Sequence, residues 1–358
     1  MSPSVIQGFV PLRKRIWGYQ GSNVSVFGTA AAGARVMPYR GPLVINPNWT
    51  FEDVDEGDLV GLQAPSMRRW DVTTNASGPL AYDDLPWPLS ALLHGGVTPT
   101  GGGAAKTWAH QVNSQTPSAT PVGIITEQWG DDVLTDWHQG IGGVIEEATI
   151  SGNVGGGPLQ LQYTMRFTDG RGTGYTDYQE SGTVPAAVTI DSTPAWVYLD
   201  DCELFIDDAF GSIGGTKITD ALEALSITVR NIIDIKQYAN GSNTRFKAAA
   251  LARARMEIES SFTFAKTSQT VGTGSEADDW LSSTAVKRFV EARFTSPEII
   301  TGVTPYSWVL RLPGFYTTRE DGESGNNTRV ILTKVGKYDA DLGYPIRSVV
   351  VCAATGLS

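Results

Sequence analysis

The stretch ALARARMEIESSFTF, residues 250–264, decides the fold class. Ala, Leu, Arg and Glu are good helix formers, so propensity alone favours a helix here. Apolar side chains nevertheless recur at even positions, and four charged side chains hold odd positions between them: Arg253, Arg255, Glu257 and Glu259. On a helix this pattern would spread around the axis, whereas on a strand it gives one apolar and one charged face. We therefore predict a long amphipathic strand, because burial of one face overrides local propensity.

The same alternation recurs elsewhere in the chain. It is clear at residues 144–150, 159–165 and 286–294, and 40 glycines and 19 prolines separate such short runs. Gly and Pro in these positions are typical of a protein with many strands and turns. One helix is indicated at residues 84–95, where Asp84 can cap the start, prolines fill the first turn and Gly95 can close the end. The sequence predicts an all-β dominated fold with one or two short helices.

Length and composition predict the domain organisation. A chain of 358 residues can hold one large β domain or two smaller ones. We expect an N-terminal arm or irregular lead-in at 1–41, whose aromatic residues dock on its own domain or on a neighbouring subunit. Two β domains follow, at 42–190 and 191–358, because residues 185–196 form a proline-bracketed connector between strand-rich stretches. A single barrel with insertions is the alternative.

The charge of the chain indicates which partners it can hold. A formal net charge of -11 repels phosphates, so we expect no tight binding to nucleic acid. The short basic run Arg13, Lys14 and Arg15 is interpreted as a solvated loop. Two cysteines are too few for a disulfide framework and favour a reducing compartment. No secretory signal and no membrane-spanning stretch is expected.

Motifs that would support catalysis are weak. The run from Gly101 to Thr107 is similar to a phosphate-binding loop, but Ala105 stands where a glycine should precede the lysine. The three histidines, His94, His110 and His138, have no partners at metal-ligand spacing. Acidic pairs such as Asp200 and Asp201, among 10 tryptophans, leave a glycoside hydrolase open as an alternative. We expect a protein that is not an enzyme, without cofactor or metal.

Three groups of short motifs, in order along the chain, carry a family resemblance. The first runs from PSMRRW (65–70) through the leucine-rich helix to Gly95 and Gly96. The second is LFIDDAFGSIGGT (204–216) with ALSITV (224–229), and the third is YDADLG (338–343) with VVV (349–351). Together they resemble the major tail tube protein family of siphophages, the long-tailed bacteriophages, from about residue 60 to the C-terminus.

The resemblance implies a β-barrel or sandwich whose copies join into rings, which stack into a hollow tube through which DNA passes. It further implies rings that are trimers with pseudo-sixfold symmetry or hexamers, bridged by Gly-rich loops and the 1–41 arm. Implied partners are tape-measure, tail-terminator and tail-tip proteins. The implied location is the virion tail, after assembly in the host cytoplasm. DNA transits without specific binding, and no membrane is involved. An acidic wall repels phosphate, so Glu257 and Glu259 are the lumen-facing candidates, with Arg253 and Arg255 on the same predicted face.

Two alternatives remain open from the sequence. A carbohydrate-binding or adhesion β-module would use exposed aromatic platforms such as Trp129 and Trp137. Another virion component, a capsid or tail-tip protein, is the second alternative. The formation of rings or tubes by the purified protein would separate the tube protein from the module.

Overall fold

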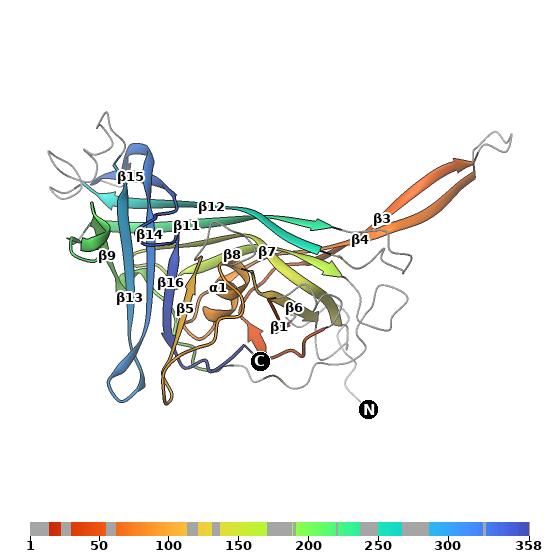
Figure 1. Cartoon of the computed structure of the whole chain (residues 1–358), viewed down its shortest axis with the longest axis horizontal. Coiled ribbons are helices and arrows are strands. Elements are labelled where there is room, and N and C mark those ends of the chain that lie inside the picture. Colours follow the sequence, from red (N-terminus) through yellow and green to blue (C-terminus); the bar gives the residue numbers. More distant parts are fainter. Residues whose placement is uncertain are drawn as a thin grey trace, which may run out of the picture.

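A computed structural model of the chain describes residues 14–22, 30–54, 62–112, 121–130, 137–169, 188, 191–219, 221–236, 250–266, 286–324 and 327–357. Within them the fold is made almost entirely of antiparallel strands around one short α-helix, which confirms the predicted fold class (Figure 1). The elements are β1 (Lys14–Gly21), β2 (Arg35–Met37), β3 (Leu43–Val54), β4 (Leu62–Pro79), α1 (Pro86–Leu92), β5 (Lys106–Gln111), β6 (Ile124–Gly130), β7 (Trp137–Asn153), β8 (Gln160–Asp169), β9 (Cys202–Asp207), β10 (Lys217–Ile218), β11 (Leu222–Lys236), β12 (Ala250–Ala265), β13 (Arg288–Thr301), β14 (Thr304–Ser324), β15 (Asn327–Gly336) and β16 (Arg347–Cys352).

The strands form one connected antiparallel network. Its main path runs β10-β9-β13-β14-β15-β12-β11-β7-β6-β1-β2, and β8 joins β7 to the β3–β4 hairpin. Two long strands change partners along their length and so fold the network around a core. β7 pairs with β6 in its first part and β11 in its last, while β14 pairs with β13 and β16 before it pairs with β15. At the β14 change a glycine is required, since a Cβ on Gly314 would lie 2.1 Å from the Val335 carbonyl oxygen.

The one α-helix of the described residues lies inside the molecule. The predicted helix exists at α1, and every one of its residues is buried, so it is a central helix rather than an amphipathic surface one (Figure 1). The predicted cap is wrong: Leu85 occupies the N-cap position without a side-chain cap bond. Asp84 instead accepts a hydrogen bond from Arg35 Nε at 2.7 Å. Its carboxylate therefore holds the start of β2 rather than the first turn of α1.

The hydrophobic core contains side chains from both sides of the predicted 185–196 connector. Its largest fully buried members include Trp17, Trp108, Phe262 and Trp308, which belong to one contiguous cluster. Strand pairing also crosses the connector, because β11 pairs with β7 and β16 pairs with β5. The division at this connector into domains 42–190 and 191–358 stays a prediction.

The N-terminal segment differs from the irregular lead-in that was predicted at 1–41. Residues 14–21 form β1, which pairs with β2 and β6, and the Trp17 side chain on it is fully buried. This part of the segment is thus docked on its own chain. Residues 1–13 lie outside the described residues. Four consecutive residues of β1, from Arg15 to Gly18, are buried, so the strand has no alternation by which the sequence could reveal it.

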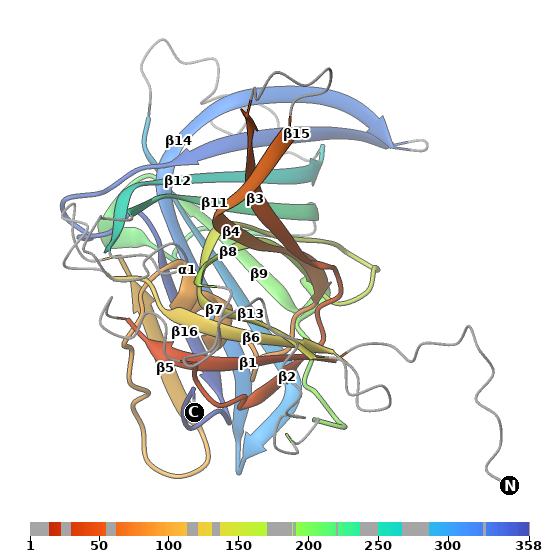
Figure 2. The same ribbon diagram turned by 90° about the vertical axis from the view of Figure 1, so that its right-hand side faces the viewer.

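Three hairpins project from the body. The β3–β4 hairpin extends farthest in Figure 1, and the β14–β15 hairpin extends as a curved arm in Figure 2. The β13–β14 hairpin ends at Gly302, whose φ of 58° suits a tight turn, and at Val303, which is 92% exposed. Hairpins of this kind add surface without adding core, so they are available for contacts with other molecules.

Candidate functional site

One broad outer surface is formed by β8, β7, β11 and β12, and we call it the polar sheet face. A row of small polar residues crosses these strands in register: Gln160 opposite Ser151, Ser151 opposite Ser226, and Ser226 opposite Ser261. The inward side chains that alternate with them, such as Leu225, are buried. The four strands therefore present an apolar side to the core and an uncharged, hydroxyl-rich row outward.

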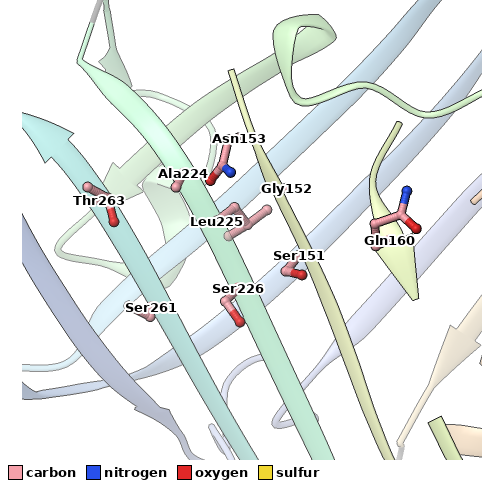
Figure 3. Close-up of a pocket in the computed structure, with 9 residues that line it drawn as sticks. All are labelled: Ser151, Gly152, Asn153, Gln160, Ala224, Leu225, Ser226, Ser261 and Thr263. Carbon is pink, nitrogen blue, oxygen red and sulfur yellow. The ribbon is translucent and has the colours of Figure 1, made fainter. Parts of the chain in front are cut away.

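A shallow depression of about 260 Å³ lies in this row (Figure 3). It is lined by Ser151, Gly152, Asn153, Gln160, Ala224, Leu225, Ser226, Ser261 and Thr263. None of these side chains is aromatic or ionisable. The depression thus has neither a stacking platform for a base or sugar nor an acid or base for catalysis.

Next to the polar row lies a second row that carries charges. Thr149 and Thr228 are bonded through their hydroxyls at 2.9 Å, and Thr228 lies opposite Glu259. Arg230 Nε lies 3.1 Å from Glu147 Oε2, and its Nη1 lies 4.0 Å from Glu259 Oε2. Arg255 Nε lies 3.4 Å from Glu257 Oε1. These exposed pairs contribute little to stability, but they leave few isolated charges on the surface.

The predicted lumen candidates Glu257 and Glu259 are brought together on this face. Their side chains are 42% and 54% exposed, so both are accessible to a molecule that passes over the sheet. Arg255, at 66% exposed, shares the face as the alternation predicts. The strand at 250–264 and its outward carboxylates are therefore present as expected.

Arg253 does not share this face, which corrects the predicted alternation. The β11–β12 register shifts between Ile232 and Ile233, which lie opposite Arg255 and Arg253. The residue between the two arginines, Ala254, is thus the extra residue of a β-bulge, and the bulge turns Arg253 to the opposite face from Arg255. Arg253 is 8% exposed and donates to the Leu93 carbonyl at the end of α1 at 2.9 Å. Burial lowers its pKa to about 10.

Arg15 was interpreted as part of a solvated loop, and that interpretation is wrong. Its side chain is 1% exposed and donates to Tyr163 Oη and the Gly41 carbonyl, both at 2.7 Å. Glu127, also fully buried, lies 3.5 Å from it and accepts hydrogen bonds from Trp17 Nε1 at 2.9 Å and Thr74 Oγ1 at 2.7 Å. These hydrogen bonds are sealed from solvent and link side chains of β1, β4, β6 and β8, so the cluster holds the four strands together, although Arg15 Nε has no hydrogen-bond partner among the described residues.

Ser90 and His110 form a hydrogen-bonded pair, Oγ to Nε2, at 2.9 Å. Such a pair is the starting point of nucleophilic catalysis, but both residues are 0% exposed. Burial lowers the pKa of His110 to about 3, so the ring is neutral at pH 7. No substrate can reach this pair in the fold described, and we assign it to the packing of α1 against β5.

The remaining sequence candidates are dispersed. The Gly101–Thr107 run forms a turn closed by the Thr100–Thr107 bridge and leads into β5 rather than a helix. Trp129 is half-buried with its ring 5.9 Å from that of His138. The Trp137 side chain lies outside the described residues. Among the residues described, no three His, Cys, Asp or Glu side chains are grouped to hold a metal ion.

A scan against protein-family models finds no match, and a search of curated proteins finds no matching relative. None of the helices in the described part of the chain has the length and apolarity to cross a membrane.

Proposed function

We propose that this chain is a structural virion protein that polymerises into stacked rings, which form the hollow tail tube of a long-tailed bacteriophage. DNA passes through the tube to the host. In this proposal the chain has no catalytic role, and its principal partner is itself. Tape-measure, tail-terminator and tail-tip proteins complete the tail.

The polar sheet face is the observation that carries the proposal. A conduit for DNA must neither stack bases nor bind phosphates, because aromatic platforms and basic grooves retain nucleic acid. The face offers hydroxyl and amide groups in its central row. The ion pairs on its strands join Glu146 to Arg166, Glu147 and Glu259 to Arg230, and Glu257 to Arg255, so these three arginines are paired with carboxylates. A wall of this kind lets a polyanion slide.

The strand edges support assembly. Within the described residues, β10 and β2 end the main path of the sheet, β5 pairs only with β16, and β3 pairs only with β4. In the described part of the chain, β10, β2 and β3 each have an edge without a partner strand, and the second edge of β5 carries only the Thr100–Thr107 bridge. Such edges are a liability in a monomer and an interface in a closed ring. The projecting β3–β4, β13–β14 and β14–β15 hairpins are suited to reach a neighbouring ring (Figures 1 and 2).

Electron microscopy of the purified protein, together with light scattering after size-exclusion chromatography, tests the proposal. We expect rings or tubes with a central channel, at a mass that is a multiple of 38.4 kDa. A protein that stays monomeric over the whole range of concentration and ionic strength would refute the assembly. Retention of that monomer on a carbohydrate matrix would favour an adhesion module instead.

A further inference from the structure

A second pocket, of about 380 Å³, lies beyond the end of β7. It forms where the turn between β7 and β8, the segment 196–201 and the irregular part of β13 meet. Its lining is Gly155, Gly156, Trp196, Tyr198, Asp200, Asp201, Ser296, Pro297 and Glu298. The volume is within the range of small-molecule sites, and the lining differs sharply from the aromatic-free depression of the polar sheet face.

Two aromatic rings form one wall of this pocket. Along residues 195–199 buried and half-buried positions alternate, with Ala195, Val197 and Leu199 in the core. Trp196 and Tyr198 therefore point outward together, two residues apart. The backbone under them is fixed, because Val197 donates to the Leu80 carbonyl at 3.0 Å and accepts from the Leu159 amide at 2.7 Å. The two rings are thus held at the surface by a segment whose backbone is bonded on both sides.

Three carboxylates line the same pocket. Asp200 Oδ1 accepts a hydrogen bond from the Gly155 amide at 2.9 Å, which fixes it at the rim. Burial, and then the charge of Asp200, raises the pKa of Asp201. No Lys, Arg or His lines the pocket, and within the described residues none of the ion pairs includes Asp200, Asp201 or Glu298. The repulsion between Asp200 and Asp201 is therefore not balanced by a nearby cation of the described fold.

We propose that this pocket binds a planar guanidinium group, as carried by an arginine side chain. A guanidinium stacks on Trp or Tyr through cation–π attraction and donates paired hydrogen bonds to carboxylates. A neutral sugar could stack on the same rings but would leave the carboxylates without a counter-charge. The carboxylates are not grouped closely enough to hold a metal ion by themselves. This inference does not depend on the tail-tube proposal.

Saturation-transfer difference NMR tests the site, since it detects weak ligands of a monomer or an assembly alike. The probe is N-acetyl-arginine amide, and its neutral isostere N-acetyl-citrulline amide is the matched control ligand. We expect saturable binding of the arginine probe, with a Kd at least tenfold lower than the Kd of the citrulline control. Asp201→Asn with Glu298→Gln should weaken it at least tenfold, and Trp196→Leu should also weaken it.

The control variant Glu320→Gln with Glu323→Gln removes two exposed carboxylates from the β14–β15 arm and should leave the affinity within twofold of that of the parent protein. Thermal unfolding midpoints verify that each variant is folded. The assignment would be overturned if citrulline or putrescine bound with the same affinity as the arginine probe. It would also be overturned if methyl glucoside bound saturably in place of arginine, or if the control variant lost as much affinity for the arginine probe as the pocket variants. The absence of any transfer to the arginine probe would overturn it too.

Discussion

Arg253 and Asn231 meet at the C-terminal end of α1, where Arg253 Nε donates to Asn231 Oδ1 at 3.0 Å. Both side chains also donate to the Leu92 carbonyl, at 3.2 Å and 2.8 Å respectively. The last carbonyls of a helix have no partner within the helix, and a cation is favourable beside them. Two paired strands thereby anchor the only α-helix that the described residues contain.

Arg253→Met should destabilise the protein by about 2–4 kcal/mol, because it leaves the buried Leu92 and Leu93 carbonyls and Asn231 short of donors. The matched control is Arg255→Met, two residues along β12 with a 66% exposed side chain, which should change stability by less than about 0.5 kcal/mol. Urea unfolding followed by circular dichroism measures both. Equal effects of the two substitutions would show that Arg253 is not the partner of the helix end.

Asp84 should make stability depend on pH in an acidic window. Burial raises its pKa from 3.8 to about 6, although Arg35 opposes that rise. A carboxyl whose folded pKa is raised stabilises the fold below its unfolded pKa and loses this contribution as pH rises through its folded pKa. From about pH 4 to about pH 6, the unfolding free energy of the parent protein should therefore fall relative to that of Asp84→Asn.

The fall is at most about 3 kcal/mol, the value of a shift of about two pKa units. Chemical unfolding of both proteins at several pH values between 3.5 and 7.5 measures it. A difference that does not change with pH would contradict the raised pKa of Asp84. If the unfolding free energy of the parent protein instead rose relative to that of Asp84→Asn as pH increased, the ion pair with Arg35 would be shown to dominate.

Glu127→Gln should cost about 3–5 kcal/mol, because it leaves the buried Arg15 guanidinium without its counter-charge. Trp17 Nε1 and Thr74 Oγ1 donate to different oxygens of Glu127, and Gln has only one oxygen, so the loss includes a hydrogen bond as well as the charge. Adding Arg15→Met should recover part of that loss, and the double variant should be less destabilised than the sum of the single ones by at least about 1 kcal/mol. Additive single effects would contradict the coupling of the pair.

Reversing the charge at Glu257 and Glu259 to Lys should slow DNA passage without blocking assembly, if the polar sheet face lines the lumen. Two new cations beside Arg230 and Arg255 would form a basic patch that retains phosphates. The control is Glu320→Lys with Glu323→Lys on the β14–β15 arm. Infection assays by time of DNA entry, with electron microscopy of the tails, measure the two effects. Normal DNA entry in the Glu257 and Glu259 variant would refute the lumen assignment.

The sequence predicted the fold class because a strand that buries one face needs apolar side chains at every second position. Strands predicted at 144–150, 159–165, 250–264 and 286–294 lie within or overlap β7, β8, β12 and β13. In β8 and in residues 256–264 of β12, side chains toward the core repeat with period two, and this regularity is visible in the sequence. In β13, residues 288–292 are all buried, so its alternation of apolar and charged residues does not separate a core face from a solvent face. The helix at α1 was recognisable from its prolines and leucines, although its burial on all sides was not.

Positions that depend on distant partners could not be predicted. A bulge at Ala254 moves Arg253 off the charged face, and only the register with β11 reveals it. In the sequence Arg15 resembles a surface residue, because only the fold places Glu127 and Tyr163 of other strands beside it. Glu291 is also fully buried, since Arg293 and Arg311 both bind its carboxylate. The serine row of the polar sheet face is likewise visible only when four strands are aligned.

The most direct test of the tail-tube proposal is a cryo-electron microscopy reconstruction of the polymer formed by the purified protein. The proposal predicts a hollow tube of stacked rings, with the polar sheet face turned to the channel and Glu257 and Glu259 on its wall. A polymer in which this face is buried between subunits or turned outward would contradict the account, as would a protein that forms no polymer.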